Sequence, residues 1–163
     1  MKAHRTAVSL MLLVAACFGA LAAGESEADL KTLNHLQQIG QACLIYAAEN
    51  RGYLPTTFAQ IEPELRQPEA FLDARNDTKP PADWEKLSPE QRADWANKNA
   101  EFDFTSVAGQ KSFRIKHPFD VPLATTRDKP GRKKVTLFAD GRAQIEGSGV
   151  DPASLPPPPA TKP

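Results

Sequence analysis

The strongest structural pattern in this chain is Asn34-His35-Leu36-Gln37-Gln38-Ile39-Gly40-Gln41-Ala42-Cys43-Leu44-Ile45-Tyr46-Ala47-Ala48-Glu49-Asn50-Arg51-Gly52-Tyr53-Leu54-Pro55. In and just before this segment, apolar or small residues recur every three or four positions, which is typical of the buried face of an amphipathic helix. The recurring residues are Leu33, Leu36, Gly40, Cys43 and Ala47, and Ile39 and Tyr46 widen the face. We therefore expect one long helix over approximately residues 29–50.

The sequence also marks where this helix ends. Gly52 tolerates the left-handed backbone conformation that closes a last helical turn, and Pro55 prevents the helix from resuming. Within the helix, Gly40 and its small neighbours leave room for another backbone layer to approach closely. These features describe a structural helix covered by a sheet, and they contain no catalytic pattern.

The N-terminus has the layout of an export signal. Residues 1–5 are basic, and residues 7–23 are apolar or small apart from Ser9. The apolar run of about 17 residues is at the lower limit for crossing a bilayer core of roughly 30 Å. Three fates stay open for residues 1–24: cleavage after Ala22 or Ala23, lipidation of Cys17 in a run that resembles a bacterial lipobox, or retention as an anchor. Each of them predicts an exported protein of the periplasm or cell envelope.

Composition supports an exported chain with a single folded unit. The 20 basic and 20 acidic residues give a formal net charge of zero, which argues against a nucleic-acid binder because such proteins need a basic face. Cys43 is the only cysteine after the leader, so no disulfide can form within the folded unit. On the apolar face of the helix, Cys43 is expected to be a buried small hydrophobe.

Residues 56–98 are rich in proline and charge and contain two helix starts. Thr57 is a suitable N-cap for a short helix. Ser88-Pro89-Glu90-Gln91 predicts a second helix that runs to about Asn99, with Ser88 as N-cap and Gln91 completing a capping box. Between them, Phe71 and Leu72 are expected to anchor a loop to the core.

Two tryptophans flank the second helix start. Trp84, Leu87 and Trp95 are expected to pack together as a satellite cluster. The alternative is that Trp84 and Trp95 form an aromatic surface for a ligand.

After residue 101 the apolar period changes to two, which indicates strands. Phe102 and Phe104 predict one strand, and residues 112–116 predict another, with Phe113 and Ile115 on one face. Residues 135–139 and 142–146 predict a hairpin with Asp140-Gly141 as a two-residue type I′ turn. In that register Phe138 faces Ala143 and Thr136 faces Ile145, on the side that covers the helix.

The predicted fold class is therefore α+β, with one long N-terminal helix packed on a small antiparallel sheet that ends in the Asp-Gly hairpin. Residues 28–150 form this domain. Residues 151–163 are dominated by proline and are expected to be an extended, disordered tail.

Catalytic patterns are missing from the sequence. After the leader the only histidines are His35 and His117, and nothing in their spacing predicts the three convergent ligands of a metal site or a base with an orienting partner. We interpret both as solvated or capping residues, and we expect no enzymatic activity, cofactor or metal. The basic run Arg132-Lys133-Lys134 is interpreted as a solvated entry to the hairpin, with contact to an anionic surface as the alternative.

Two segments resemble prepilin-type proteins that carry an H-x9-DG domain, which are relatives of the type II secretion pseudopilins. Residues 34–55 are similar to the family segment "NLKQIG…YANDN.GYLP". Val135-Thr136-Leu137-Phe138-Ala139-Asp140-Gly141-Arg142 is similar to its closing "VLFADGH" hairpin. The matches span about residues 30–147, and they imply a pilin-like globular head.

The chain departs from this family at three points. Pro130 stands where the family has its histidine, Arg142 stands where the histidine after Asp-Gly would be, and the prepilin leader is missing. The resemblance therefore implies a pilin-like fold but not processing by the prepilin peptidase.

Two functions follow from these expectations. The first is an exported, non-enzymatic envelope protein with a pilin-like or pseudopilin-like structural role, acting by contact with other envelope or pilus-like proteins or with itself. The alternative is a small periplasmic lipoprotein that binds a ligand or polysaccharide through the Trp84/Trp95 region. An apolar strip left exposed on the long helix would favour the first.

Overall fold

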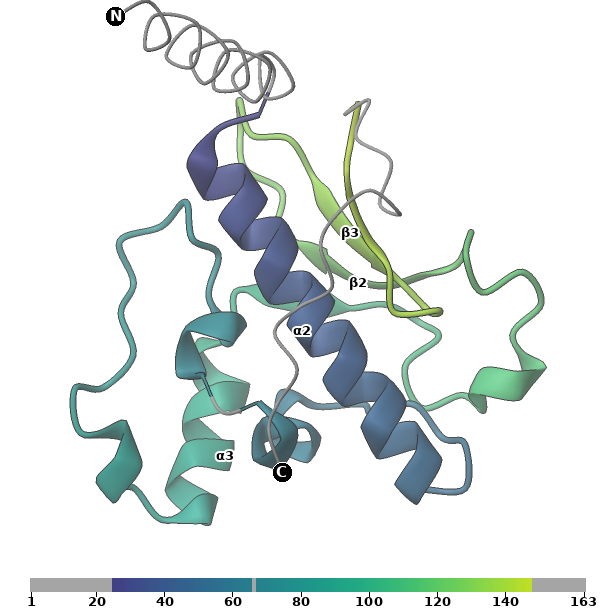
Figure 1. Cartoon of the computed structure of the whole chain (residues 1–163), viewed down its shortest axis with the longest axis horizontal. Helices are drawn as coiled ribbons and strands as arrows, with labels where there is room; N and C mark the ends of the chain where they lie inside the picture. Colours follow the sequence, from purple (N-terminus) through teal and green to yellow (C-terminus); the bar gives the residue numbers. More distant parts are fainter. Residues whose placement is uncertain (1–24, 66, 148–163) are drawn as a thin grey trace, which may run out of the picture.

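The computed structural model describes residues 25–65 and 67–147 (Figure 1). Its helices and strands follow the chain in the order α2 (Glu27–Glu49), α3 (Pro89–Asn99), β1 (Phe102–Phe104), β2 (Pro122–Thr126), β3 (Val135–Phe138) and β4 (Ala143–Ile145). Short 3-10 helices are η1 (Phe58–Gln60), η2 (Glu62–Glu64), η3 (Pro68–Phe71), η4 (Trp84–Lys86) and η5 (Ser112–Arg114). The described part of the chain is therefore α+β, as expected. The predicted tail, residues 151–163, and the predicted leader, residues 1–24, lie outside the described residues.

The long helix begins slightly earlier than its apolar pattern predicts. Ser26 is the N-cap: its Oγ accepts a hydrogen bond from the Asp29 backbone N–H at 3.1 Å, and Asp29 Oδ2 accepts one from the Ser26 N–H at 3.2 Å. This reciprocal capping box satisfies two amide groups that a bare helix end would leave unpaired. The expected apolar stripe is buried, with Leu36, Ile39 and Cys43 fully inaccessible to solvent.

The predicted helix stop is confirmed. The Gly52 N–H donates to the Ala47 carbonyl at 2.8 Å, which closes the last turn. Gly52 has a φ of 84°, and Arg51 also adopts a left-handed conformation with a φ of 56°. Pro55 is buried, and the chain turns away from the helix axis there.

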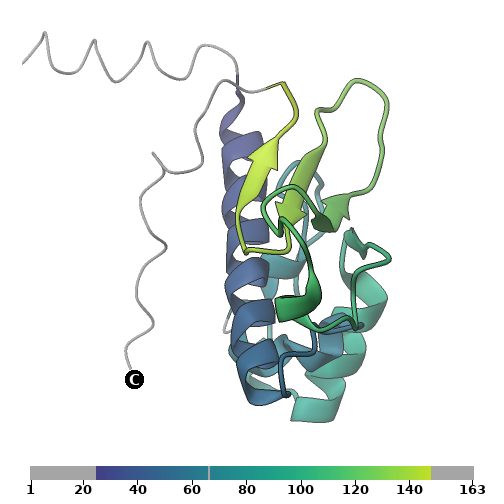
Figure 2. The ribbon, with the colours of Figure 1, turned by 90° about the vertical axis from the view of Figure 1, so that its right-hand side faces the viewer.

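The sheet is antiparallel with strand order β1-β2-β3-β4. Helix α2 crosses one face of it and contacts β3 and β4, as both views of the ribbon show (Figures 1 and 2). On another side α2 contacts η3, and α3 packs on η1, η2 and η3. The core between these layers includes Leu36, Ile39, Phe71, Leu137 and Ile145.

Gly40 is where helix and hairpin approach most closely. A Cβ atom at this position would lie 2.7 Å from both the Gly141 carbonyl oxygen and Leu137 Cδ1. No real side chain fits at such distances without displacing backbone. The predicted role of Gly40, close approach of another layer, is confirmed.

The predicted hairpin exists, but its register is different. Val135 pairs with Ile145 and Leu137 pairs with Ala143. These four side chains are buried against α2, whereas Phe138 and Thr136 are only half-buried. The prediction that Phe138 and Thr136 face the helix is therefore wrong.

The cause is the length of the turn. The Gly141 N–H donates to the Phe138 carbonyl at 2.9 Å, and the Phe138 N–H donates to the Arg142 carbonyl at 2.7 Å, so residues 139–141 form a three-residue loop. Only Gly141 has a positive φ, at 88°, whereas a type I′ turn would also require one at Asp140. Because side chains alternate along a strand, this one-residue difference moves every side chain of β3 to the opposite face. Val135 and Leu137 therefore share the buried face with Ala143 and Ile145.

A second strand prediction is also wrong. Residues 112–114 form η5, and the Phe113 ring is 70% exposed instead of lying in the sheet. The sheet instead takes β2 from residues 122–126, where Leu123 and Ala124 are buried. Pro122 is accommodated because it is the first residue of that strand. The prediction for β1 is confirmed: Phe102 is buried and Phe104 stacks on Phe58 with ring centroids 4.5 Å apart.

Candidate functional site

The two histidines do not form a shared site. His35 is buried, against expectation, and its Nδ1 lies 2.7 Å from the Leu72 carbonyl oxygen. Since a carbonyl only accepts, Nδ1 carries the proton, and desolvation lowers the pKa of His35 and keeps the ring neutral. His117 lies in the loop before β2, where its ring packs on Phe119.

Among the described residues, no group of three or more histidine, cysteine, aspartate or glutamate side chains is placed to hold a metal ion. Within residues 25–65 and 67–147, no helix combines the length and apolar character needed to span a bilayer. Cys43 is buried as expected, and burial raises the pKa of its thiol, so it is not poised as a nucleophile.

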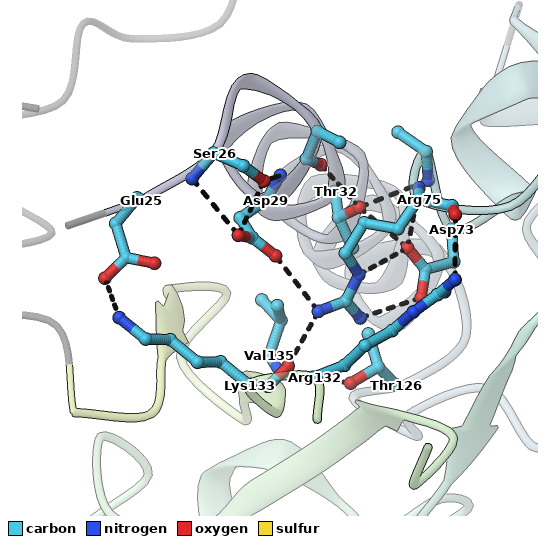
Figure 3. Close-up of polar contacts among 12 residues, drawn as sticks. Glu25, Ser26, Asp29, Thr32, Asp73, Arg75, Thr126, Arg132, Lys133 and Val135 are labelled. Carbon is cyan, nitrogen blue, oxygen red and sulfur yellow. Dashed lines mark hydrogen bonds and ion pairs between the residues drawn. The ribbon is translucent and has the colours of Figure 1, made fainter. Parts of the chain in front are cut away.

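A polar network fixes the N-terminal end of α2 (Figure 3). Arg75 Nη2 lies 2.7 Å from Asp73 Oδ2, and Arg75 Nη1 lies 3.2 Å from Asp29 Oδ1. Arg75 Nη1 also donates to the Lys133 carbonyl at 2.7 Å, and the Thr32 hydroxyl donates to Asp73 Oδ1 at 2.9 Å. The network ties α2, the loop after η3 and the entry to β3 together.

The charges in this network are paired with one another. Burial alone would raise the pKa of Asp73, but hydrogen bonds from the Arg75 side chain and backbone and from Thr32 hold it below its ordinary value. The carboxylate is therefore ionised and fully engaged, and it offers no free base for catalysis. Sequence reasoning did not identify this pair, although an Asp-x-Arg spacing directly after the anchor Leu72 is visible.

The basic run before β3 is more than a solvated entry. Lys133 Nζ lies 2.6 Å from Glu25 Oε1, and Lys134 Nζ lies 3.1 Å from Asp128 Oδ1. The hairpin entry is thereby held beside the start of α2.

Trp84 and Trp95 pack on each other as expected. Their ring centroids are 5.2 Å apart in an edge-to-face arrangement, and the Arg92 guanidinium lies 5.9 Å from the Trp84 ring. Trp84 is only 5% exposed, so neither face of its ring is openly presented. It nevertheless lines an open groove of about 680 Å³, together with Lys31, His35, Glu69, Leu72 and Lys79.

A second surface consists of large apolar side chains that remain exposed. We call it the α2-end surface, and its members are Leu44, Ile45, Tyr53, Phe113 and Phe119. They come from the last turns of α2, the segment after it, and the loop that precedes β2. Figure 2 shows this loop and η5 in front of the C-terminal half of α2.

Contacts join four of these side chains in two groups, one around Tyr53 and Phe113 and one around Leu44 and Phe119. The Lys111 ammonium lies 4.8 Å from the Tyr53 ring centroid and 5.5 Å from that of Phe113. The Phe113 ring lies against Gly52, at the end of α2.

On the hairpin side, Leu44 lies against Gly141, and Arg142 Nη2 donates to the Phe119 carbonyl at 3.1 Å. The hairpin loop therefore forms one border of the surface. Sequence reasoning missed this surface because it assigned Phe113 to the buried face of a strand.

The outcomes for the predicted structural residues divide clearly. Gly40, Gly52, Pro55 and Gly141 occupy the positions expected of them, Asp140 lies in the turn with a different conformation, and Phe138 is not in the core. Cys17 lies outside the described residues.

No family model, no curated protein and no solved structure matches this chain. Function must therefore be argued from its own surfaces.

Proposed function

We propose that this chain is an exported, non-enzymatic protein of the cell envelope that acts by protein–protein contact through the α2-end surface. The observation that carries the proposal is the contrast between the two faces of α2. Its stripe toward the sheet is buried, while Leu44 and Ile45 are 39% and 43% exposed, and the rings of Tyr53, Phe113 and Phe119 from the following segments are exposed as well. Large apolar side chains grouped on a surface mark interaction sites in soluble proteins.

The composition of this surface suits a protein partner. Aromatic residues are enriched at the centres of protein interfaces, where they supply much of the contact energy. Charged groups border the rings: the Lys111 ammonium lies near Tyr53 and Phe113, and the Arg142 guanidinium donates to the Phe119 carbonyl. An apolar centre with a charged rim is the usual anatomy of such an interface.

A pilin-like or pseudopilin-like structural role is the finer part of the proposal. It is supported by the resemblance of residues 34–55 and 135–142 to that family, and by a long helix packed on a small antiparallel sheet. The partner is then another envelope or pilus-like protein, or a second copy of this chain.

Site-specific photo-crosslinking in cells tests the contact. A photoreactive phenylalanine analogue at Phe113 is expected to give discrete crosslinked species, and Leu44→Lys in the same chain should abolish them. The matched control is the analogue at Gln91, which is exposed at the start of α3, on another side of the molecule. Equal crosslinking at both positions would contradict the proposal, and the mass of the product distinguishes self-contact from another partner.

Export is tested separately by the mass of the mature N-terminus in membrane and soluble fractions. We expect cleavage near Ala22 or retention of the leader, so Cys17→Ser should leave fractionation unchanged. Release of the serine variant from the membrane, with loss of palmitate labelling, would show lipidation instead.

The groove beside Trp84 supports a second candidate function, the binding of a small ligand or polysaccharide. Its lining includes Leu72, Trp84 and His35. Asp73 also lines it but is paired with Arg75, so the remaining charges are balanced, with Lys31 and Lys79 against Glu69 and Glu85. A neutral, polar ligand fits this balance. Saturable quenching of tryptophan fluorescence by an oligosaccharide, abolished by His35→Phe, would support this function over protein contact.

A further inference from the structure

The turn between β2 and β3 places two positive charges side by side. Lys129-Pro130-Gly131-Arg132 closes with a hydrogen bond from the Arg132 N–H to the Lys129 carbonyl at 3.2 Å, and Gly131 has a φ of 74°. Proline at the second position and a positive φ at the third are the features of a type II turn, whose first and fourth residues lie close together. The sequence of this turn therefore brings Lys129 and Arg132 together.

Both cations are directed to the same neutral atom. Lys129 Nζ donates to Asn76 Oδ1 at 2.8 Å, and Arg132 Nη1 donates to that oxygen at 2.6 Å. Arg132 Nη2 donates to the Arg75 carbonyl at 3.0 Å. The two positive groups are thus at most about 5.4 Å apart, because they share an acceptor. Like charges at this distance repel each other unless a negative charge lies beside them.

The surrounding cations differ from this pair. Arg75, Arg127, Lys133 and Lys134 each lie within 4.0 Å of a carboxylate oxygen. Within residues 25–65 and 67–147, no carboxylate lies that close to Lys129 or Arg132. Both side chains are exposed, so an external anion can reach them.

From this geometry we propose that the Lys129–Arg132 turn, with Asn76, is a binding site for an oxyanion of the phosphate class. The bonds to Asn76 and Arg75 leave two N–H groups on Lys129 and three on Arg132 available to a ligand. A guanidinium binds two oxygens of a phosphate at once, and a lysine adds a mobile point charge. Asp73 and Glu101 line the same small hollow as Lys129, but Asp73 is paired with Arg75, and Glu101 accepts hydrogen bonds from the Asp73 N–H and the Thr78 hydroxyl. The oxyanion supplies the directly bound negative charge that Lys129 and Arg132 lack.

The position of the turn offers two sources for this oxyanion. Lys133 binds Glu25 at 2.6 Å, so the turn lies at the end of the molecule where the leader joins α2 (Figures 1 and 3). If the leader is retained or lipidated, the phosphate of an anionic lipid headgroup is within reach, and otherwise a soluble phosphate is the ligand. This site is independent of the α2-end surface, and neither proposal depends on the other.

The first experiment titrates the full chain with inorganic phosphate at constant ionic strength, in a zwitterionic detergent that accommodates the leader. The readout is the NMR shift of the Gly131 amide, which we expect to move and saturate. Lys129→Gln with Arg132→Gln should weaken binding about tenfold or more, because charge-assisted hydrogen bonds are lost. The control Arg114→Gln with Lys116→Gln removes the same charge from exposed positions elsewhere and should change binding less than about twofold.

Asn76→Asp is the sharpest variant. It places a carboxylate between the two cations without removing either, so it should abolish phosphate binding while the fold is retained. The proposal is overturned if the unmodified chain shows no saturable shift, if the control pair weakens binding as much as the site pair, or if Asn76→Asp binds phosphate as well as the parent.

A second experiment identifies the source of the oxyanion. The full chain is reconstituted into vesicles of phosphatidylcholine with or without phosphatidylglycerol, and backbone hydrogen exchange is followed over residues 127–134. Slower exchange only in the phosphatidylglycerol vesicles, reversed by inorganic phosphate, assigns a lipid headgroup. Equal exchange in both vesicles, together with a saturable phosphate titration, assigns a soluble oxyanion.

Discussion

Charged groups bind the N-terminal end of α2 to the rest of the molecule, whereas close packing of small residues binds its C-terminal half. At the first end, Arg75 joins Asp29, Asp73 and the entry to β3. In the second half, Gly40 contacts the hairpin loop directly, and Leu44 beside it stays exposed. The difference teaches that charged groups and close packing on one face hold the helix, so the exposed Leu44 and Ile45 on its other face are not needed for this and can form an apolar surface.

The largest loss of stability is expected from removing the ion pair between Asp73 and Arg75 near the N-terminal end of α2. Asp73→Ala leaves the Arg75 guanidinium, whose side chain is 7% exposed, with the more distant Asp29 as its only carboxylate partner among the described residues, beside the Lys133 carbonyl. Removing one partner of a buried ion pair typically costs about 3–5 kcal/mol. Chemical denaturation should show a loss of this order in the free energy of unfolding. Lys98→Ala, which breaks a fully exposed pair with Asp94, is the control and should cost less than about 1 kcal/mol.

Acid unfolding sharpens the same test. The pKa of Asp73 is held below its ordinary value of 3.8 in the folded chain, so the unfolded chain binds the proton more tightly. The stability that this carboxylate contributes is therefore complete above pH 4 or so and is lost as pH falls through its folded pKa. Asp73→Ala should flatten the dependence of stability on pH in this acidic window. An unchanged acid limb would show that Asp73 is not the responsible group.

The next effect concerns the hairpin that covers α2. Leu137 is fully buried and Phe138 only half-buried, so Leu137→Ala should cost about 2–5 kcal/mol and Phe138→Ala distinctly less. The two-residue turn expected from the sequence predicts the reverse order. Thermal or chemical unfolding of the two variants therefore decides between the two registers.

These regions also show how far the sequence alone can be taken. The helix was predictable because its stripe and stop are local patterns over residues 33–55, whereas its Ser26 cap was not identified from the sequence. The hairpin was predictable, but its register was not, because Asp140-Gly141 fits both a two-residue and a three-residue loop. The surface at Phe113 and the contacts of Arg75 with Asp29 and the Lys133 carbonyl arise between segments far apart in the sequence, which no periodicity reveals.

A smaller effect is expected where helix and hairpin touch. Gly40→Ala adds one methyl group at a point 2.7 Å from the Gly141 carbonyl oxygen. Overpacking of this kind typically costs about 1–3 kcal/mol, because the backbone of the hairpin must shift. Gln41→Ala, at the exposed neighbouring position of α2, controls for helix propensity. If Gly40→Ala were as stable as this control, the close contact between α2 and the hairpin would not exist.

The smallest effect on stability is expected at the α2-end surface itself. Phe113 is 70% exposed and lies on η5, outside the sheet, so Phe113→Ser removes little buried area and should change the free energy of unfolding by about 0.5 kcal/mol or less. If the ring instead belonged to the core, as its alternating sequence pattern suggests, the same change would cost about 3–5 kcal/mol. The comparison is sharpened by measuring association of the same variant. Loss of crosslinking or self-association without loss of stability is the result expected of a surface kept apolar for contact. A destabilised variant would indicate that the Phe113 ring is part of the core. The assignment of this end of α2 to protein–protein contact would then lose its basis.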